Sequence, residues 1–171
     1  MKDEGKFSWI SGQKKYTALA IKAILTWKSQ MAWIRIDDGP GRKVDLTGLF
    51  AMMQAETFGG GYRVAPGMNP FGDSSRIILG FGLSKAQMLL VMGPLEKGNH
   101  VGKWGKISME PCKTFEIRAL DENGEPTLEN GHNPPLFISL DGETSMTTPV
   151  KFDFHSNVLN VRGGNDPPNV H

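Results

Sequence analysis

The strand pattern is clearest in the stretch Met31-Ala32-Trp33-Ile34-Arg35-Ile36-Asp37. Successive side chains of a β-strand point to opposite faces of the sheet. One face therefore carries Ala32, Ile34 and Ile36, and the other carries Trp33, Arg35 and Asp37. Since the first face already supplies a core-facing surface, the second, which combines an aromatic ring with charges, is available for binding.

The residues before this stretch predict a partner strand over Thr17–Trp27. Apolar side chains recur there at every second position: Leu19, Ile21, Ala23, Leu25 and Trp27. Lys28-Ser29-Gln30 would turn the chain into a hairpin. A helix is the alternative, because the stretch is also rich in helix-forming residues. As a strand, it would place Trp27 in the core.

The residues after it predict a turn and then a helix. Gly39-Pro40-Gly41 would end the hairpin, and Asp45 or Thr47 would cap the helix. The apolar side chains that follow at helical spacing are Leu46, Leu49, Phe50 and Met53. Gly59-Gly60-Gly61 would stop the helix.

The remaining chain predicts loops and short strands. A flexible loop is expected over 59–75, and strands over 76–81, 114–120, 136–140 and 150–154, with a turn at 121–124. Ser84 would cap a second helix, unless residues 86–92 continue as a buried strand.

Together these patterns predict an α+β, β-rich fold, a curved antiparallel sheet with one or two helices packed on one face. Residues 1–162 would form a single domain, with an option of two similar halves divided near 59–75. Residues 163–171, rich in Gly, Asn and Pro, would form a flexible tail.

The charge of the chain is divided along its length, although the formal net charge is only +1. Residues 1–106 carry 15 basic against 8 acidic side chains, and residues 107–171 carry 4 against 10. All four tryptophans lie in the basic part. Cations and flat aromatic rings suit a single-stranded nucleic acid, whose phosphates need charge and whose bases need stacking platforms. A solvated surface over an aromatic core would have the same composition.

Several classes of function find no support in the sequence. The four histidines and the single cysteine, Cys112, show no metal-ligand spacing, and Gly80-Phe81-Gly82 is an incomplete dinucleotide motif. We therefore expect no catalytic residues, no metal, no cofactor and no enzymatic activity. The lack of a signal peptide or a long apolar run predicts an intracellular protein, neither secreted nor membrane-bound.

The candidate nucleic-acid-binding residues are basic or aromatic and fall into three groups. They are Lys14, Lys15 and Tyr16; Lys28, Trp33, Arg35 and Lys43; and Lys97, Lys103 and Trp104. Arg42 accompanies Lys43 in the second group, and Lys106 belongs to the third.

Two short stretches resemble families of single-stranded DNA-binding proteins. Trp9-Ile10-Ser11-Gly12-Gln13-Lys14-Lys15-Tyr16-Thr17-Ala18-Leu19-Ala20-Ile21 resembles the opening strand of Whirly-type proteins. Gly41-Arg42-Lys43-Val44-Asp45-Leu46-Thr47 is similar to the strand-to-helix step of the related transcriptional-coactivator family. The resemblance covers the first ~60 residues. It implies a curved sheet, oligomers and contacts from Lys14, Lys15 and Tyr16, but the chain lacks an obvious long C-terminal helix.

The first functional hypothesis is therefore a homo-oligomeric protein that binds single-stranded DNA or RNA, DNA being the first choice, with little sequence specificity. The alternative is a β-rich structural or assembly protein, such as a phage-like virion or scaffold component. In that case the oppositely charged ends would meet head to tail between subunits. An enzyme ranks third.

Overall fold

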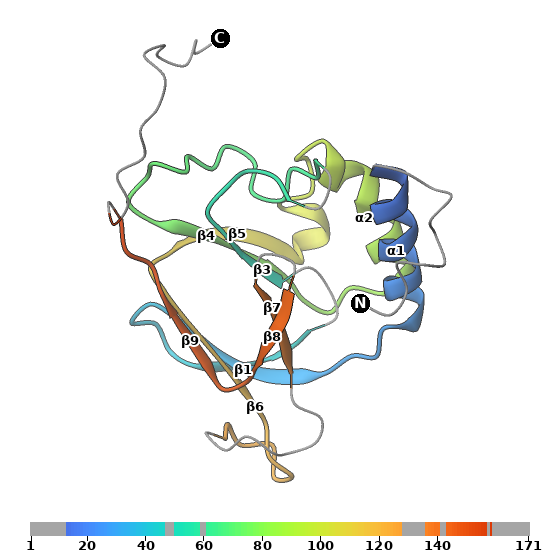
Figure 1. Ribbon diagram of the computed structural model, residues 1–171. Coiled ribbons are helices and arrows are strands. Elements are labelled where there is room, and N and C mark those ends of the chain that lie inside the picture. Colours follow the sequence, from blue (N-terminus) through green and yellow to red (C-terminus); the bar gives the residue numbers. More distant parts are fainter. Residues whose placement is uncertain are drawn as a thin grey trace.

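The computed structural model describes residues 13–46, 50–58, 61–127, 136–140, 143–156 and 158. Its helical elements are α1 (Gln13–Thr26), α2 (Lys85–Glu96) and the short 3₁₀ helix η2 (Lys103–Gly105). Its strands are β1 (Met31–Ile36), β2 (Arg42–Asp45), β3 (Phe50–Met53), β4 (Ser75–Gly80), β5 (Ile107–Cys112), β6 (Thr114–Ala119), β7 (Phe137–Leu140), β8 (Glu143–Thr147) and β9 (Val150–Asp153). The predicted α+β, β-rich class with antiparallel sheets and two α-helices is confirmed (Figure 1).

Four strands form the first sheet, sheet A, in the order β2-β1-β6-β9, and every neighbouring pair is antiparallel. The alternation predicted for residues 31–37 is confirmed here. Ala32 and Ile34 are fully buried on the inner face, whereas Trp33 lies on the outer face between Lys43 and Arg118.

Three strands form the second sheet, sheet B, in the order β3-β4-β5. One of its faces packs on sheet A, where Ile77 and Leu79 join Ile34 and Phe115 in one core. The other face packs under α2 and the loop after β3, where Ile78 joins a second core. Because β4 is buried on both faces, its sequence reads as a nearly continuous apolar run. The β7–β8 ribbon adds Leu136 to the core between the sheets.

Two of the predicted elements are wrong. The predicted strand Thr17–Trp27 is helix α1, which directs Ile24 into the second core and leaves Ile21 and Leu25 exposed. The helix predicted from Asp45 or Thr47 to Met53 is replaced by β2 and β3. Val44 pairs with Ala32, and Phe50 pairs with Leu79, so strand pairing and burial outweigh the helical spacing. Residues 47–49 lie outside the described residues.

Most of the other predicted elements are confirmed. Ser84 caps α2 with a capping box, in which its hydroxyl accepts from the N–H of Gln87 and the Gln87 side chain accepts from the N–H of Ser84. The strands predicted at 76–81, 114–120, 136–140 and 150–154 correspond to β4, β6, β7 and β9. Strands β5 and β8 were not predicted; β5 contains Pro111, which a strand tolerates at the edge of a sheet.

Residues 1–12 and 159–171 lie outside the described residues. The predicted tail, 163–171, lies beyond the described residues, and the single domain over 1–162 stays a prediction. Among the described residues, no helix has the length and apolar character needed to cross a membrane.

A single residue, Lys113, carries the chain from sheet B into sheet A, between β5 and β6. The carboxylate of Asp37 accepts hydrogen bonds from the backbone N–H groups of Lys113 and Thr114, at 2.8 and 2.7 Å. The N–H of Asp37 donates to the carbonyl of Thr114 at 2.8 Å, and the N–H of Phe154 donates to that of Lys113 at 2.7 Å. Asp37 therefore holds the corner that joins the two sheets.

This corner gives the first prediction. Replacing Asp37 with Ala removes the acceptor of two backbone N–H groups, which should lower the free energy of unfolding by about 2–4 kcal/mol. Asn keeps a side-chain oxygen and tolerates the left-handed backbone of this position, φ 47°, so D37N should cost less than about 1.5 kcal/mol. The measurement is urea unfolding. D38A, at the exposed neighbour, is the matched control and should stay within about 0.5 kcal/mol; equal effects of D37A and D38A would contradict the role of the corner.

His100 is a fully buried polar side chain beside the second core. Its Nε2 donates to the carbonyl of Val64 at 3.0 Å, and its Nδ1 has no hydrogen-bond partner among the described residues. Burial lowers the pKa of His100 below its usual value, and the Val64 carbonyl opposes this shift only in part. The folded protein therefore holds His100 neutral.

The second prediction is an acid-dependent loss of stability. Below pH about 6.5 the unfolded chain takes up a proton on His100 that the folded chain resists, so the free energy of unfolding falls as the pH drops. The loss reaches up to about 1.4 kcal/mol per pH unit until the pH passes the folded pKa. We expect the difference in unfolding free energy between wild type and H100Q to shrink from pH 7.5 to pH 5.5. A difference that stays constant would show that His100 titrates alike in both states.

Candidate functional site

The predicted binding residues fall on separate layers of the fold. Trp33, Arg35 and Lys43 lie on the outer face of sheet A, whereas Lys97, Lys103 and Trp104 lie in the segment that joins α2 to β5 in sheet B. Lys28 follows α1 and is exposed. The positions of Lys14, Lys15 and Tyr16 are on α1, with side chains outside the described ones. Trp33, Arg35 and Lys43 therefore lie on a different part of the fold from Lys97, Lys103 and Trp104.

Arg35, Arg118 and Lys43 on the outer face of sheet A are paired with acidic side chains. The buried Glu116 accepts from Arg35 at 2.7 Å and from Nε of Arg118 at 2.6 Å. Both guanidinium groups lie near the ring of Trp33, at 5.8 Å for Arg35 and 4.8 Å for Arg118. Gly41 lies so close under this ring that a Cβ there would meet it. The ring and its cations already bind one another, which weakens the prediction of a phosphate track.

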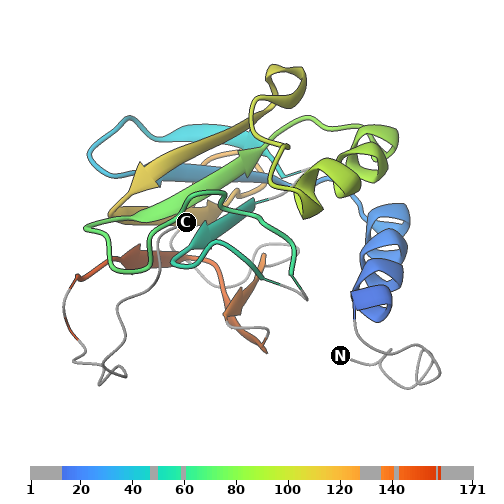
Figure 2. The same ribbon diagram turned by 90° about the horizontal axis from the view of Figure 1, so that it is seen from above.

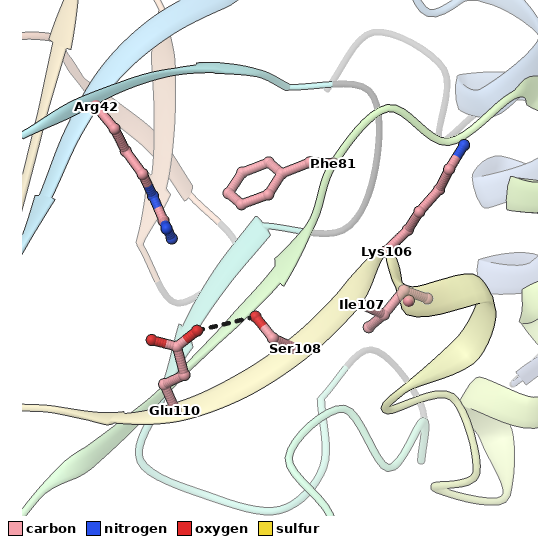
Figure 3. Close-up of a pocket in the computed structure, with 7 residues that line it drawn as sticks. Arg42, Phe81, Lys106, Ile107, Ser108 and Glu110 are labelled. Carbon is pink, nitrogen blue, oxygen red and sulfur yellow. Dashed lines mark hydrogen bonds between the residues drawn. The ribbon is translucent and has the colours of Figure 1, made fainter.

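A hollow of about 370 Å³ lies between the edge strands of the two sheets, β2 and β5. Figure 3 shows Arg42 and Phe81 on one side of it and the Ser108–Glu110 pair on the other. The hollow is lined by Arg42, Phe81, Gly105, Lys106, Ile107, Ser108 and Glu110. It combines a cation, a carboxylate and a hydroxyl with apolar side chains.

Strand alternation directs polar side chains of β2 and β5 into this hollow. Arg42 is two residues from the buried Val44, on the face of β2 that looks toward sheet B. Ser108 and Glu110 are even-numbered residues of β5, like the buried Cys112, and face sheet A. The hydroxyl of Ser108 donates to Glu110 at 3.1 Å and so engages one carboxylate oxygen.

The two cations of the hollow differ in how they are bonded. The Arg42 guanidinium lies 5.7 Å from the centre of the Phe81 ring and forms no ion pair within the described part of the chain. The ammonium of Lys106 instead donates to the carbonyl of Gly82 at 2.6 Å and to the side chain of Gln87 at 3.3 Å, away from the hollow (Figure 3). Arg42 is therefore the cation that can turn to a ligand.

A row of aromatic rings leads from the hollow into the core between the sheets. The ring centroid of Phe50 lies 6.4 Å from that of Phe81 and 5.2 Å from that of Phe115. Phe81 and Phe50 are half-buried, and Phe115 is buried. The inner wall of the hollow is thus continuous with the apolar interior, and a ligand could place a polar end against Arg42 and Glu110 and an apolar end against the rings.

Cys112 does not add a nucleophile to this site. Burial raises the pKa of its thiol to about 11, with smaller effects in the same direction from the charges of Asp37 and Glu110. The thiol donates to the carbonyl of Thr114 at 3.3 Å. Across the described ranges, no group of three His, Cys, Asp or Glu side chains is placed to hold a metal ion.

The sequence pointed to only part of this hollow. Arg42 and Lys106 belong to the predicted basic groups, and Phe81 was noted only within the incomplete motif Gly80-Phe81-Gly82. Ser108 and Glu110 were not predicted. The signal that could have found them is the alternation of Ser108, Glu110 and Cys112, which is recognisable only once residues 107–112 are taken as a strand.

The fold is similar to two solved structures of a "putative diacylglycerol kinase" from Bacillus anthracis str. Sterne. They have TM-scores of 0.58 and 0.55, each at 16% sequence identity and over 80% of this chain. The chain spans only 42% and 41% of the length of these proteins. At this identity the likeness concerns the fold. Comparison with curated proteins found no match.

A family model settles the assignment. The model of the YegS C-terminal NAD kinase beta sandwich-like domain matches residues 3–163. This match shows that the predicted kinship with Whirly-type proteins is wrong, and with it single-stranded DNA or RNA binding and the virion or scaffold alternative. The prediction of a non-enzyme is contradicted as well, because the family is one of NAD kinase beta sandwich-like domains. The chain belongs to the family of YegS C-terminal NAD kinase beta sandwich-like domains.

Proposed function

We propose that this chain binds the lipid acceptor of a diacylglycerol kinase-like reaction, and that the hollow between β2 and β5 receives the glycerol end of that lipid. The observation that carries the proposal is the amphipathic make-up of the hollow, in which Arg42, Ser108 and Glu110 meet the ring of Phe81. The family match and the similarity to the two Bacillus anthracis structures support a lipid kinase.

The polar groups of the hollow match the polar groups of a diacylglycerol. Such a lipid carries one hydroxyl and two ester carbonyls. The carboxylate of Glu110 accepts a hydrogen bond from the hydroxyl, while Ser108 holds the carboxylate in place. Arg42 donates to the ester carbonyls from its guanidinium. The hydroxyl of the lipid is thus paired with Glu110, and its ester carbonyls are paired with Arg42.

The apolar groups match the acyl chains. From the glycerol, an acyl chain can follow the rings of Phe81 and Phe50 toward the core between the sheets. Apolar area removed from water there contributes about 25 cal/mol per Å². A nucleotide base would need an open ring on which to stack, and the ring of Phe81 is already faced by Arg42. The aromatic row therefore favours a lipid.

Glu110 also has a chemical role in this proposal. A phosphoryl acceptor hydroxyl must lose its proton as it attacks, and a carboxylate within hydrogen-bond reach takes that proton as a general base. Glu110 is the only carboxylate that lines the hollow among the described residues. It therefore binds the acceptor and accepts its proton.

The third prediction tests the hollow directly. We expect 1,2-dioctanoylglycerol, titrated into the ¹⁵N-labelled chain, to shift the amide resonances of Phe81 and of residues 106–110. Arg42→Ala and Glu110→Ala should each weaken binding about tenfold, because each removes a hydrogen bond to a charged group worth about 1.5 kcal/mol. The dissociation constants come from the same titrations.

The matched control is Lys43→Ala. Lys43 neighbours Arg42 on β2 but points to the opposite face, where it pairs with Glu125 at 2.8 Å. K43A should bind the lipid as wild type does. Resonance shifts that avoid β5, or an equal loss in K43A and R42A, would reject the hollow as the acceptor site.

A further inference from the structure

The ring of Phe81 stands between the hollow and the aromatic row behind it. Phe81 lines the hollow together with Arg42, whose guanidinium lies 5.7 Å from the centre of the ring (Figure 3). The next ring inward is that of Phe50, at 6.4 Å between centroids, and Phe50 is not one of the described residues that line the hollow. An acyl chain that follows the row inward therefore meets Phe81 first, and how far it reaches depends on that ring.

The backbone of Phe81 is fixed at the start of β5. Figure 2 shows the chain leaving the green strand β4 toward α2, beside the beginning of the yellow strand β5. There the N–H of Phe81 donates to the carbonyl of Lys106 at 3.1 Å, and the ammonium of Lys106 donates to the carbonyl of Gly82 at 2.6 Å. Lys106 thus holds the backbone on both sides of Phe81, so that only a rotation of the side chain can move the ring.

The hollow is small for a diacylglycerol. Its volume of about 370 Å³ is near the lower end of the range for ligand pockets, about 300–1,000 Å³. A glycerol with two ester groups, placed between Arg42 and Glu110, already fills part of this volume. Protein interiors are close-packed, so the core behind Phe81 offers further depth only if a ring moves or is removed. The room left for the acyl chains is therefore limited by the ring of Phe81.

We propose that Phe81 determines the length of acyl chain that the hollow accepts, and that Lys106 is the positioning residue that keeps its ring in place. The inference rests on the proposed function, because it concerns the acyl chains of the same lipid acceptor. The first methylene groups of a chain lie against the ring, and the rest of a longer chain stays outside the hollow. Methylene groups beyond the ring therefore add little affinity, and the hollow suits glycerides with short acyl chains as well as those with long ones.

The fourth prediction compares the dissociation constants of 1,2-dihexanoylglycerol and 1,2-dioctanoylglycerol, both measured from the amide shifts of residues 106–110. In wild type the two constants should differ by less than about threefold, because the added methylene groups stay outside the hollow. Phe81→Ala frees the space of one ring for them. Each methylene group buried there strengthens binding about fourfold, so this variant should bind dioctanoylglycerol at least about tenfold more tightly than dihexanoylglycerol.

Two further variants test the stop in other ways. Phe81→Leu keeps an apolar side chain in the wall and should raise the preference for dioctanoylglycerol less than Phe81→Ala does; it takes the place of Phe81→Ala if that variant does not fold. Lys106→Met keeps the aliphatic stem but removes the ammonium that holds the carbonyl of Gly82. It should raise the same preference, again by less than Phe81→Ala, whereas an unchanged preference would overturn the positioning role of Lys106.

The matched control is Phe71→Ala, which removes an 86% exposed ring from the loop before β4 and should keep the wild-type ratio of the two dissociation constants. If both glycerides bind and the ratio is the same in wild type and Phe81→Ala, the inference is overturned while the proposed function stands. A change in Phe71→Ala as large as in Phe81→Ala overturns it as well. If neither glyceride shifts the resonances of the hollow in wild type, the proposed function fails and the inference fails with it.

Discussion

The carboxylate of Asp37 holds the one-residue corner at which the chain leaves sheet B and enters sheet A. A corner this short leaves its backbone N–H groups without a partner from either strand ladder, and such groups are costly when unpaired. Asp37 accepts two of them, and the N–H of Phe154 satisfies the Lys113 carbonyl. The relative position of the two sheets, and everything built between them, depends on this corner.

The corner at Lys113 determines which strand edges of the two sheets lie near each other. Strand β5 leads into the corner as the edge of sheet B, and β2 is an edge of sheet A. Between these edges the side chains do not interdigitate fully, and a hollow remains. Strand alternation directs Arg42, Ser108 and Glu110 toward the hollow. The apolar wall of the hollow is formed by Phe81 and Phe50, which lie at the outer edge of the core. The same packing that stabilises the fold thus prepares a site for a ligand that is polar at one end and apolar at the other.

The basic and acidic parts of the sequence form ion pairs with each other in the folded chain. On sheet A, cations of the basic part are paired with acidic side chains of the later part, as in Arg35 with Glu116 and Lys43 with Glu125. These pairs link residues about 80 positions apart, so they join the basic and the acidic part of the sequence across sheet A. The segment 13–36, which contains α1, has no Asp or Glu of its own.

The sequence by itself determined the elements whose pattern agrees with their environment. Residues 31–37 and 114–120 alternate because one face of each strand is buried, whereas Ser84 indicated a helix start and left a strand over 86–92 open. Only the tertiary structure decided the elements whose pattern was ambiguous. Residues 17–27 satisfy a period of two and also favour a helix, and packing of Ile24 on the second core chose the helix. Leu46, Leu49, Phe50 and Met53 have helical spacing, yet residues 42–45 and 50–53 pair with β1 and β4 as strands. The hollow belongs to this second class. Arg42 on β2, Phe81 just after β4 and Glu110 on β5 are brought together only by long-range pairing, and local sequence carries no information on which edges will meet.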